Sequence, residues 1–349
     1  NQNDMNSDIN PNMIVLAREA RGLSQQDLAE KLNLHKANVS RLENGDTNIH
    51  KETLLAISEA TCFPPQFFTQ EGISMPANLA YRKRQQVPVR LLTPIEAKMN
   101  IIRRHVQFVT RALDKVSPQL PVLTVTEDRK PAMIADLVRK QWQLKDEAIE
   151  NLINILESKG IIICSFNFDT ERVDSRSMLT DDKYPIIFLN KNLLGDRFRY
   201  SLAYELGQLV MHTFTIVSPE RDISREANEF AAAFLMPEKA IRKDFESGIT
   251  LSLLGELKRK WKASMISLLY RADDLGFLTP NQKRYLIQQF NQQKIRRREP
   301  MELDVPIEHP TLLKRLIKKY ITDYEIGVIE MAAILAIPID DYIDFYGEY

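Results

Sequence analysis

Residues 12–60 carry apolar side chains in short runs at helical spacing, and turn-forming residues separate the runs. Ser24 stands where the second run begins and can cap a helix, with Asp27 near the positive end of that helix. Asn33 follows at a position where a tight turn needs a positive φ, which Asn tolerates better than most residues. Asn44 and the glycine after it end a third run. The pattern predicts short helices joined by tight turns, with the third over residues 36–43.

Residues 23–32 and 39–45 closely resemble the XRE (lambda-repressor-like) helix-turn-helix family. The resemblance implies a third helix that lies in the major groove of a double-stranded DNA operator, bound by a homodimer. The exposed positions of that helix would read bases; they are Lys36, Ala37, Asn38, Ser40 and Arg41. Gln25 and Asn44 match the family's phosphate-contacting positions. The alternative is that Lys36 and Arg41 do not contact DNA and simply form a solvated face of the helix.

Two features weaken the predicted attraction to DNA. His35 stands where the family usually has Ser or Thr as the N-cap of the third helix, and imidazole caps less well. Residues 1–75 also carry 6 Lys/Arg against 10 Asp/Glu.

The charge of the chain is segregated, however: residues 76–115 carry 9 Lys/Arg against 2 Asp/Glu, and residues 239–299 carry 14 against 6. A net charge of zero therefore does not exclude an anionic partner, and the basic cluster at residues 81–84 either contacts phosphates or is solvated.

A second motif lies at residues 204–208, which read Tyr-Glu-Leu-Gly-Gln where a very similar metallopeptidase motif reads His-Glu-Leu-Gly-His. In the intact motif, two histidines one helical turn apart bind zinc, and the glutamate is the general base. Glu205 is present here, but Tyr204 and Gln208 replace both histidines. A phenol and an amide are poor zinc ligands beside imidazole, so the sequence predicts a peptidase fold without zinc.

Residues 199–212 and 226–237 strongly resemble the ImmA/IrrE family of zinc metallopeptidases, and the resemblance covers most of residues 130–305. It implies that Glu226 matches a third zinc ligand. We expect no metal, no cofactor and no catalytic residue, and a degenerate site whose members can hydrogen-bond one another: Tyr204, Glu205, Gln208 and Glu226.

Two alternatives keep a metal in this region. A pair formed by Gln208 and His212 would move the site by about 6 Å and leave Glu205 misplaced as a base. We therefore expect His212 to pack or to cap the end of its helix. The second alternative is that Tyr204 and Gln208 are laboratory substitutions in an intact zinc site.

The predicted fold class is α+β but mostly α. It comprises an all-α helix-turn-helix domain, a zincin-like domain with a small sheet, and a helical C-terminal segment. An amphipathic helix is expected over 95–115, strands over 161–166 and 184–189, a loop or hairpin over 169–183, and a long helix over 197–212. Two helices are expected within 309–349. The predicted domain bounds are 9–70 for DNA binding, 71–115 for a basic linker and helix, 116–300 for the peptidase-like domain and 301–349 for the C-terminal segment.

Together these observations predict a sequence-specific DNA-binding regulator, similar to prophage repressors or antitoxins, whose degenerate domain binds or senses a partner. Two alternatives stay open: an active zinc metallopeptidase that cleaves a regulatory protein, and an antitoxin that acts mainly by sequestering a toxin. Cys62 and Cys164 lack metal or redox spacing, and the chain has no apolar stretch of membrane-spanning length. We therefore expect a cytoplasmic protein without a membrane partner.

Overall fold

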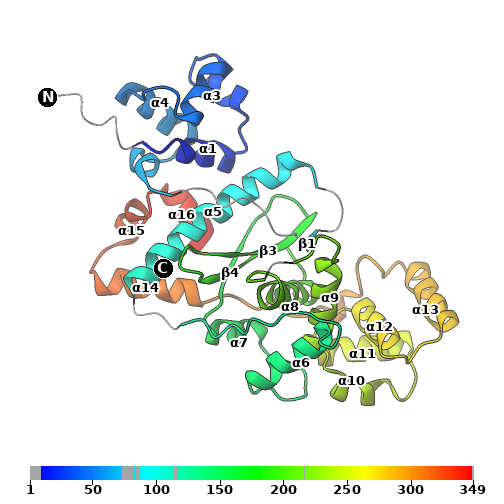
Figure 1. Ribbon diagram of the computed structural model, residues 1–349. Coiled ribbons are helices and arrows are strands. Elements are labelled where there is room, and N and C mark those ends of the chain that lie inside the picture. The colour runs from blue at the N-terminus through cyan, green and yellow to red at the C-terminus, as the bar shows by residue number, and fades with distance from the viewer. Residues whose placement is uncertain (1–8, 73–81, 84–86, 114–116, 216, 348–349) are drawn as a thin grey trace.

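The computed structural model describes residues 9–72, 82–83, 87–113, 117–215 and 217–347. Over these residues the chain is mostly α-helical with one small sheet, so the predicted fold class is confirmed. Figure 1 shows a small helical head at one end and a larger body built around the sheet.

The head consists of short helices: α1 (Pro11–Ala20), α2 (Gln25–Lys31), α3 (Lys36–Asn44), α4 (Lys51–Thr61) and the 3-10 helix η1 (Pro65–Thr69). Ser24 caps α2 through reciprocal hydrogen bonds with Asp27, and Asn33 takes a φ of 53°, as the sequence predicted. Each α-helix places apolar side chains in a common core. Helices this short gain most of their stability from such packing.

A long helix, α5 (Val89–Ala112), connects the head to the body. The sequence predicted this helix from residue 95, but it begins earlier and includes Pro94. Proline lacks the N–H that an α-helix needs and usually ends or kinks it. Here the proline ring packs against the turn after α1, because a Cβ added at Gly22 would lie 3.7 Å from Pro94 Cγ. Tertiary packing therefore outweighs the local cost.

Four strands form the sheet in the order β1-β3-β4-β2. Their bounds are β1 (Arg82–Lys83), β2 (Ile162–Phe166), β3 (Val173–Leu179) and β4 (Pro185–Asn190). The strands β3 and β4 pair antiparallel, and β2 pairs parallel with β4. Where the sequence predicted a loop or hairpin over 169–183, the structure has a single strand, β3, which pairs with β4. Of the basic cluster at residues 81–84, Arg82 and Lys83 form β1, and Tyr81 and Arg84 lie outside the described residues.

The sheet separates two hydrophobic cores. Ile186 and Phe188 of β4 face the core that the head shares with α5 and the C-terminal helices, whereas Ile187 and Leu189 face the core of the rest of the body. Side chains on both faces of the sheet are thus buried, which explains why β2 and β4 consist of continuous apolar runs.

The second core is covered by α6 (Pro131–Gln141), α7 (Leu152–Ser158), α8 (Gly195–Met211) and α9 (Ile223–Leu235). The chain continues through α10 (Glu238–Phe245), α11 (Leu251–Trp261), α12 (Met265–Asp274), α13 (Pro280–Gln292) and the 3-10 helix η2 (Met301–Leu303). In Figure 1 these later helices lie beyond α9, at the end of the body away from the head.

The C-terminal segment forms three helices rather than the predicted two: α14 (Leu312–Asp323), α15 (Val328–Ile334) and α16 (Ile339–Tyr346). It packs on the body and the head. The hydroxyl of Tyr346 lies 2.6 Å from Nδ1 of the buried His105 on α5. The guanidinium of Arg21 in the head donates two hydrogen bonds to Asp341, at 2.9 and 2.7 Å.

Candidate functional site

The predicted base-reading residues lie on α3 and are accessible. Four of them are exposed and Ser40 is half-buried: Lys36, Ala37, Asn38 and Arg41. The opposite face of α3 buries Val39 and Leu42 in the head core. The helix therefore presents a polar, cationic face to its surroundings while its apolar face fixes its position.

The two ends of α3 differ in how well they are capped. His35 occupies the N-cap position and makes no capping hydrogen bond through its side chain, as expected for an imidazole there. Gly45 ends the helix with a φ of 75°, a left-handed conformation that glycine adopts without steric cost. Asn44, a predicted phosphate contact, is the last residue of the helix and is exposed.

Gln25, the other predicted phosphate contact, is half-buried at the start of α2. Its side-chain nitrogen donates to the carboxylate of Glu43 at 2.7 Å. Glu43 in turn pairs with Arg18 in a buried ion pair. This link between three helices was missed in the sequence, because neither Arg18 nor Glu43 stands out by spacing. These contacts hold the Gln25 amide in one orientation at the start of α2.

In the body, Tyr204, Gln208 and His212 follow one another at intervals of four residues, so they line the same side of α8. All three are almost fully buried. They face α9, which approaches closely because Gly207 carries no side chain: a Cβ there would lie 2.9 Å from the ring of Phe230.

Hydrogen bonds connect this row of side chains from one end to the other. The Tyr204 hydroxyl lies 3.2 Å from Ser224 Oγ and 3.2 Å from the Gln208 amide. The same amide lies 2.8 Å from His212 Nδ1. His212 Nε2 lies 2.7 Å from Glu226 at the start of α9. We call this set, with Ser224, the α8–α9 network.

Glu226 ends the α8–α9 network in an ion pair. Arg221 donates to its carboxylate, with Nε at 2.9 Å. Burial acts to raise the pKa of Glu226, but the hydrogen bonds from Arg221 and His212 outweigh that effect and hold the pKa below its usual range. Glu226 is therefore an anion whose oxygens already accept hydrogen bonds from two neighbours.

His212 lies between the Gln208 amide and the Glu226 carboxylate. Burial lowers the pKa of His212 more than its bond to Glu226 raises it, so the ring is neutral near neutral pH. The Gln208 nitrogen donates to the hydroxyl of Tyr204, and the Gln208 oxygen faces His212 Nδ1.

Glu205 points to the sheet. Its two carboxylate oxygens accept hydrogen bonds from Ser175 and Ser177 of β3, each at 2.8 Å. The four residues of the predicted degenerate site are thus arranged in two parts. Tyr204 and Gln208 touch directly and reach Glu226 through His212, whereas Glu205 connects α8 to β3. The bridging role of His212 was missed in the sequence, which indicated only that this residue packs or caps.

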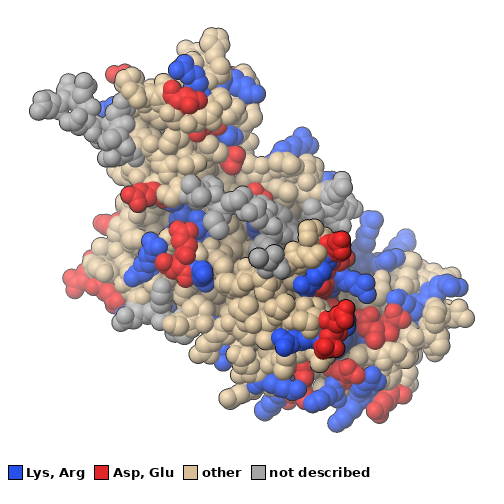
Figure 2. Space-filling view, in the orientation of Figure 1, with Lys and Arg blue, Asp and Glu red and all other residues tan. Residues whose placement is uncertain are grey.

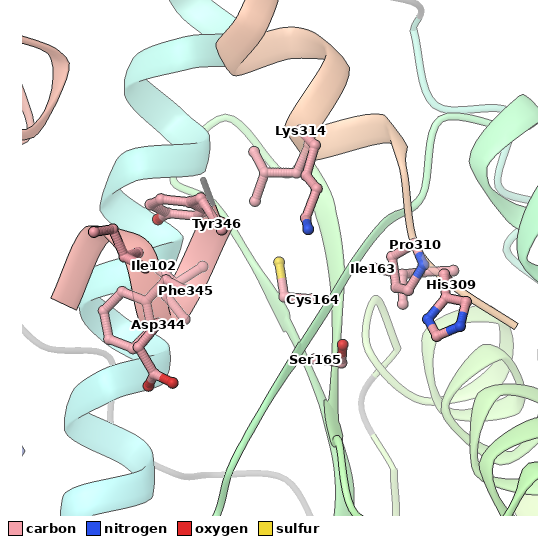
Figure 3. A pocket seen from close by; sticks show the side chains of 13 residues that line it. Ile102, Ile163, Cys164, Ser165, His309, Pro310, Lys314, Asp344, Phe345 and Tyr346 are labelled. Atoms are coloured by element: carbon pink, nitrogen blue, oxygen red, sulfur yellow. The ribbon is translucent and has the colours of Figure 1, made fainter. Parts of the chain in front are cut away.

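Among the described residues, no group of three His, Cys, Asp or Glu side chains is placed to hold a metal ion. A separate cavity of about 200 Å³ lies between α5, β2, α14 and α16 (Figure 3). Cys164 lines it, on the face of the sheet opposite the α8–α9 network. Burial raises the pKa of this thiol well above its usual range, so it is not a reactive thiolate.

Comparison with protein-family models gives one match in the head and one in the body. Residues 14–66 match the helix-turn-helix family model. Residues 156–273 match a peptidase-family model described as the IrrE N-terminal-like domain. The chain joins a helix-turn-helix domain to an IrrE N-terminal-like domain. The predicted fusion is therefore confirmed, and the head is a DNA-binding domain of the XRE type.

The IrrE-like domain includes β2 to β4, α8 and α9, and so contains the whole α8–α9 network. No curated protein matches the chain at a significant level. Within the described part of the chain, no helix is both long and apolar enough to cross a bilayer.

Proposed function

We propose that this chain is a sequence-specific DNA-binding regulator that acts as a homodimer, and that its IrrE-like domain binds a partner without cleaving it. The observation that carries the proposal is the accessible polar face of α3 within a helix-turn-helix head. One such domain contacts only a half-site, and a two-fold dimer reads two half-sites about 34 Å apart or a multiple of that distance.

The donor set on α8 and α9 supports the loss of zinc chemistry. Zinc sites use imidazole, thiolate and carboxylate groups, whereas the two motif positions here carry a phenol and an amide. The remaining carboxylate, Glu226, is held by Arg221 and His212. These residues do not fit a zinc ion.

A domain that keeps the fold but not the metal ligands is suited to binding. If the chain is an antitoxin, the IrrE-like domain would hold the toxin while the head represses the operon. An antitoxin that acts mainly by sequestering the toxin would differ from this only in that its DNA binding contributes less to its function.

The second candidate is an active zinc peptidase that cleaves a regulatory protein. The match to a peptidase family and the retained Glu205 favour it. It requires either an unconventional metal site that does not depend on histidines at positions 204 and 208, or that Tyr204 and Gln208 are laboratory substitutions of native histidines. Metal analysis separates this candidate from our proposal.

Selection of binding sites from a random duplex library, with the full chain, tests the proposed function. We expect a palindromic motif. On the selected site, Arg41→Ala or Lys36→Ala should cost about 1–3 kcal/mol of binding free energy and relax specificity at one position. Gln25→Ala should weaken binding to all sequences alike.

Arg259→Ala serves as the control, because Arg259 is exposed on α11 at the far end of the body. The absence of any enriched motif would refute sequence-specific binding, and unaltered affinity of both α3 variants would refute the assigned reading face. Sedimentation of the protein–DNA complex tests the dimer. One chain on a complete site would refute it.

A further inference from the structure

The N-terminal part of α5 lies beside the turn of the head that leads into α2. The contact between Pro94 and Gly22 fixes this point. Arg90 precedes Pro94 by one helical turn on the same side of α5, so it lies about 5–6 Å further toward the helix N-terminus. Gln25 begins α2 three residues after Gly22. Arg90 and the start of α2 are thus brought to the same side of the molecule by parts of the chain far apart in sequence.

Both regions line one hollow of about 220 Å³. The head contributes Arg21 and Gly22, and α5 contributes Arg90 and Lys98. Figure 2 shows basic side chains at the tip of α5, next to the head and on its visible side. The head and α5 thus place three cations around this hollow, which Asp169 also lines.

Among the residues that the structure describes, Arg90 is the cation of this hollow without a carboxylate partner. Arg21 pairs with Asp341 at 2.7 Å, and Lys98 lies 3.5 Å from Asp169. Arg90 is exposed and has neither an ion pair nor a hydrogen bond through its guanidinium among the described residues. A guanidinium in this state is available to an anion, and its planar donor groups suit phosphate oxygens.

The head needs cations from elsewhere in the chain. Residues 1–75 carry 6 Lys/Arg against 10 Asp/Glu, and affinity for DNA depends strongly on the number of phosphates that the protein neutralises. A duplex that contacts the beginning of α2 and lies along α3 extends past the edge of the head. The N-terminal part of α5 lies beside the turn that precedes α2, where Pro94 approaches Gly22.

We propose that Arg90 is a second DNA contact, outside the helix-turn-helix domain, which binds a backbone phosphate flanking the half-site that α3 reads. The body thereby takes part in DNA binding and supplies charge that the acidic head lacks. This inference rests on DNA binding by the head, but it does not depend on which sequence is read or on whether the chain dimerises.

The test compares the full-length protein with Arg90→Ala on two duplexes, the selected site and a scrambled sequence, over a range of salt concentrations. Loss of one phosphate contact should reduce the slope of log affinity against log salt by about 0.9 on both duplexes. Between about 50 and about 200 mM salt, the ratio of wild-type to variant affinity should therefore fall about threefold. Arg90→Lys, which keeps the charge, should restore most of the slope.

Arg259→Ala is the matched control, because it removes an exposed arginine far from the head and should leave the slope unchanged. Hydroxyl-radical footprinting should show that Arg90→Ala loses protection only at backbone positions outside the half-site. A slope for Arg90→Ala equal to that of the control would overturn the inference. If the wild type binds both duplexes equally, specific recognition fails, but the slope comparison on the scrambled duplex still decides the role of Arg90.

Discussion

Replacing Gln208 with alanine tests whether the α8–α9 network stabilises the IrrE-like domain. The Gln208 amide contacts the hydroxyl of Tyr204 at 3.2 Å and Nδ1 of His212 at 2.8 Å. Its side chain is almost completely excluded from solvent, with 1% of the residue exposed. The substitution removes the amide that joins Tyr204 to His212 and leaves Nδ1 of the buried ring without that partner.

The expected loss follows from these contacts. A buried polar group that loses its hydrogen-bond partner costs about 1–3 kcal/mol of folding free energy. Tyr204 keeps its contact with Ser224, so the larger share comes from His212. Truncation of Gln208 also leaves a small cavity. We expect Gln208→Ala to lower the free energy of unfolding by about 2–4 kcal/mol in total.

Urea denaturation followed by tryptophan fluorescence measures this loss, because Trp142 and Trp261 both lie in the core on the IrrE-like side of the sheet. Gln292→Ala, at the exposed end of α13, is the control and should change stability by less than about 0.5 kcal/mol. A double-mutant cycle with His212→Ala should give a coupling energy of about 1 kcal/mol or more. A loss for Gln208→Ala no larger than that of the control, or strict additivity with His212→Ala, would refute the stabilising role of the network.

Two further predictions concern other sites. Burial lowers the pKa of His105 to about 3, so between its ordinary pKa of 6.5 and that value the unfolded chain binds one more proton than the folded chain. Stability therefore falls by about 1.4 kcal/mol per pH unit as the pH decreases through this range, and His105→Phe should remove that component. Equal pH dependence of wild type and variant would contradict the assignment. The double substitution Tyr204→His with Gln208→His should gain zinc, measured by elemental analysis against Gln208→His alone. Equal metal content in the two variants would show either that Glu226, held by Arg221, is no longer available as a ligand or that the pairing of α8 and α9 has changed.

Local sequence patterns were enough to predict the head. Ser24, Asn33 and Gly45 each act through their own backbone or through residues within a few positions, so the caps and turns can be recognised without tertiary information. The strands β2 and β4 were equally clear, because both of their faces are buried and apolar residues follow one another without a break.

The features that were missed depend on contacts between distant residues. Strand β3 looked like a polar loop or hairpin, yet its polar residues are buried, and residues of α8 pair with three of them. Asp174 pairs with Arg197, and Ser175 donates to Glu205. In the same way, α5 could not be extended through Pro94 until the contact with Gly22 was known. The α8–α9 network was only partly foreseen, since Glu226 is brought to His212 by the packing of α9 on α8.

The most direct test of the central claim is the zinc content of the full-length protein, purified without chelator and dialysed against buffer after incubation with zinc. The proposed loss of zinc chemistry predicts well under one zinc per chain, because Tyr204 and Gln208 offer neither imidazole nor thiolate at the motif positions and Glu226 is held by Arg221. One zinc per chain that disappears in Glu226→Gln would contradict the proposal and favour an active metallopeptidase.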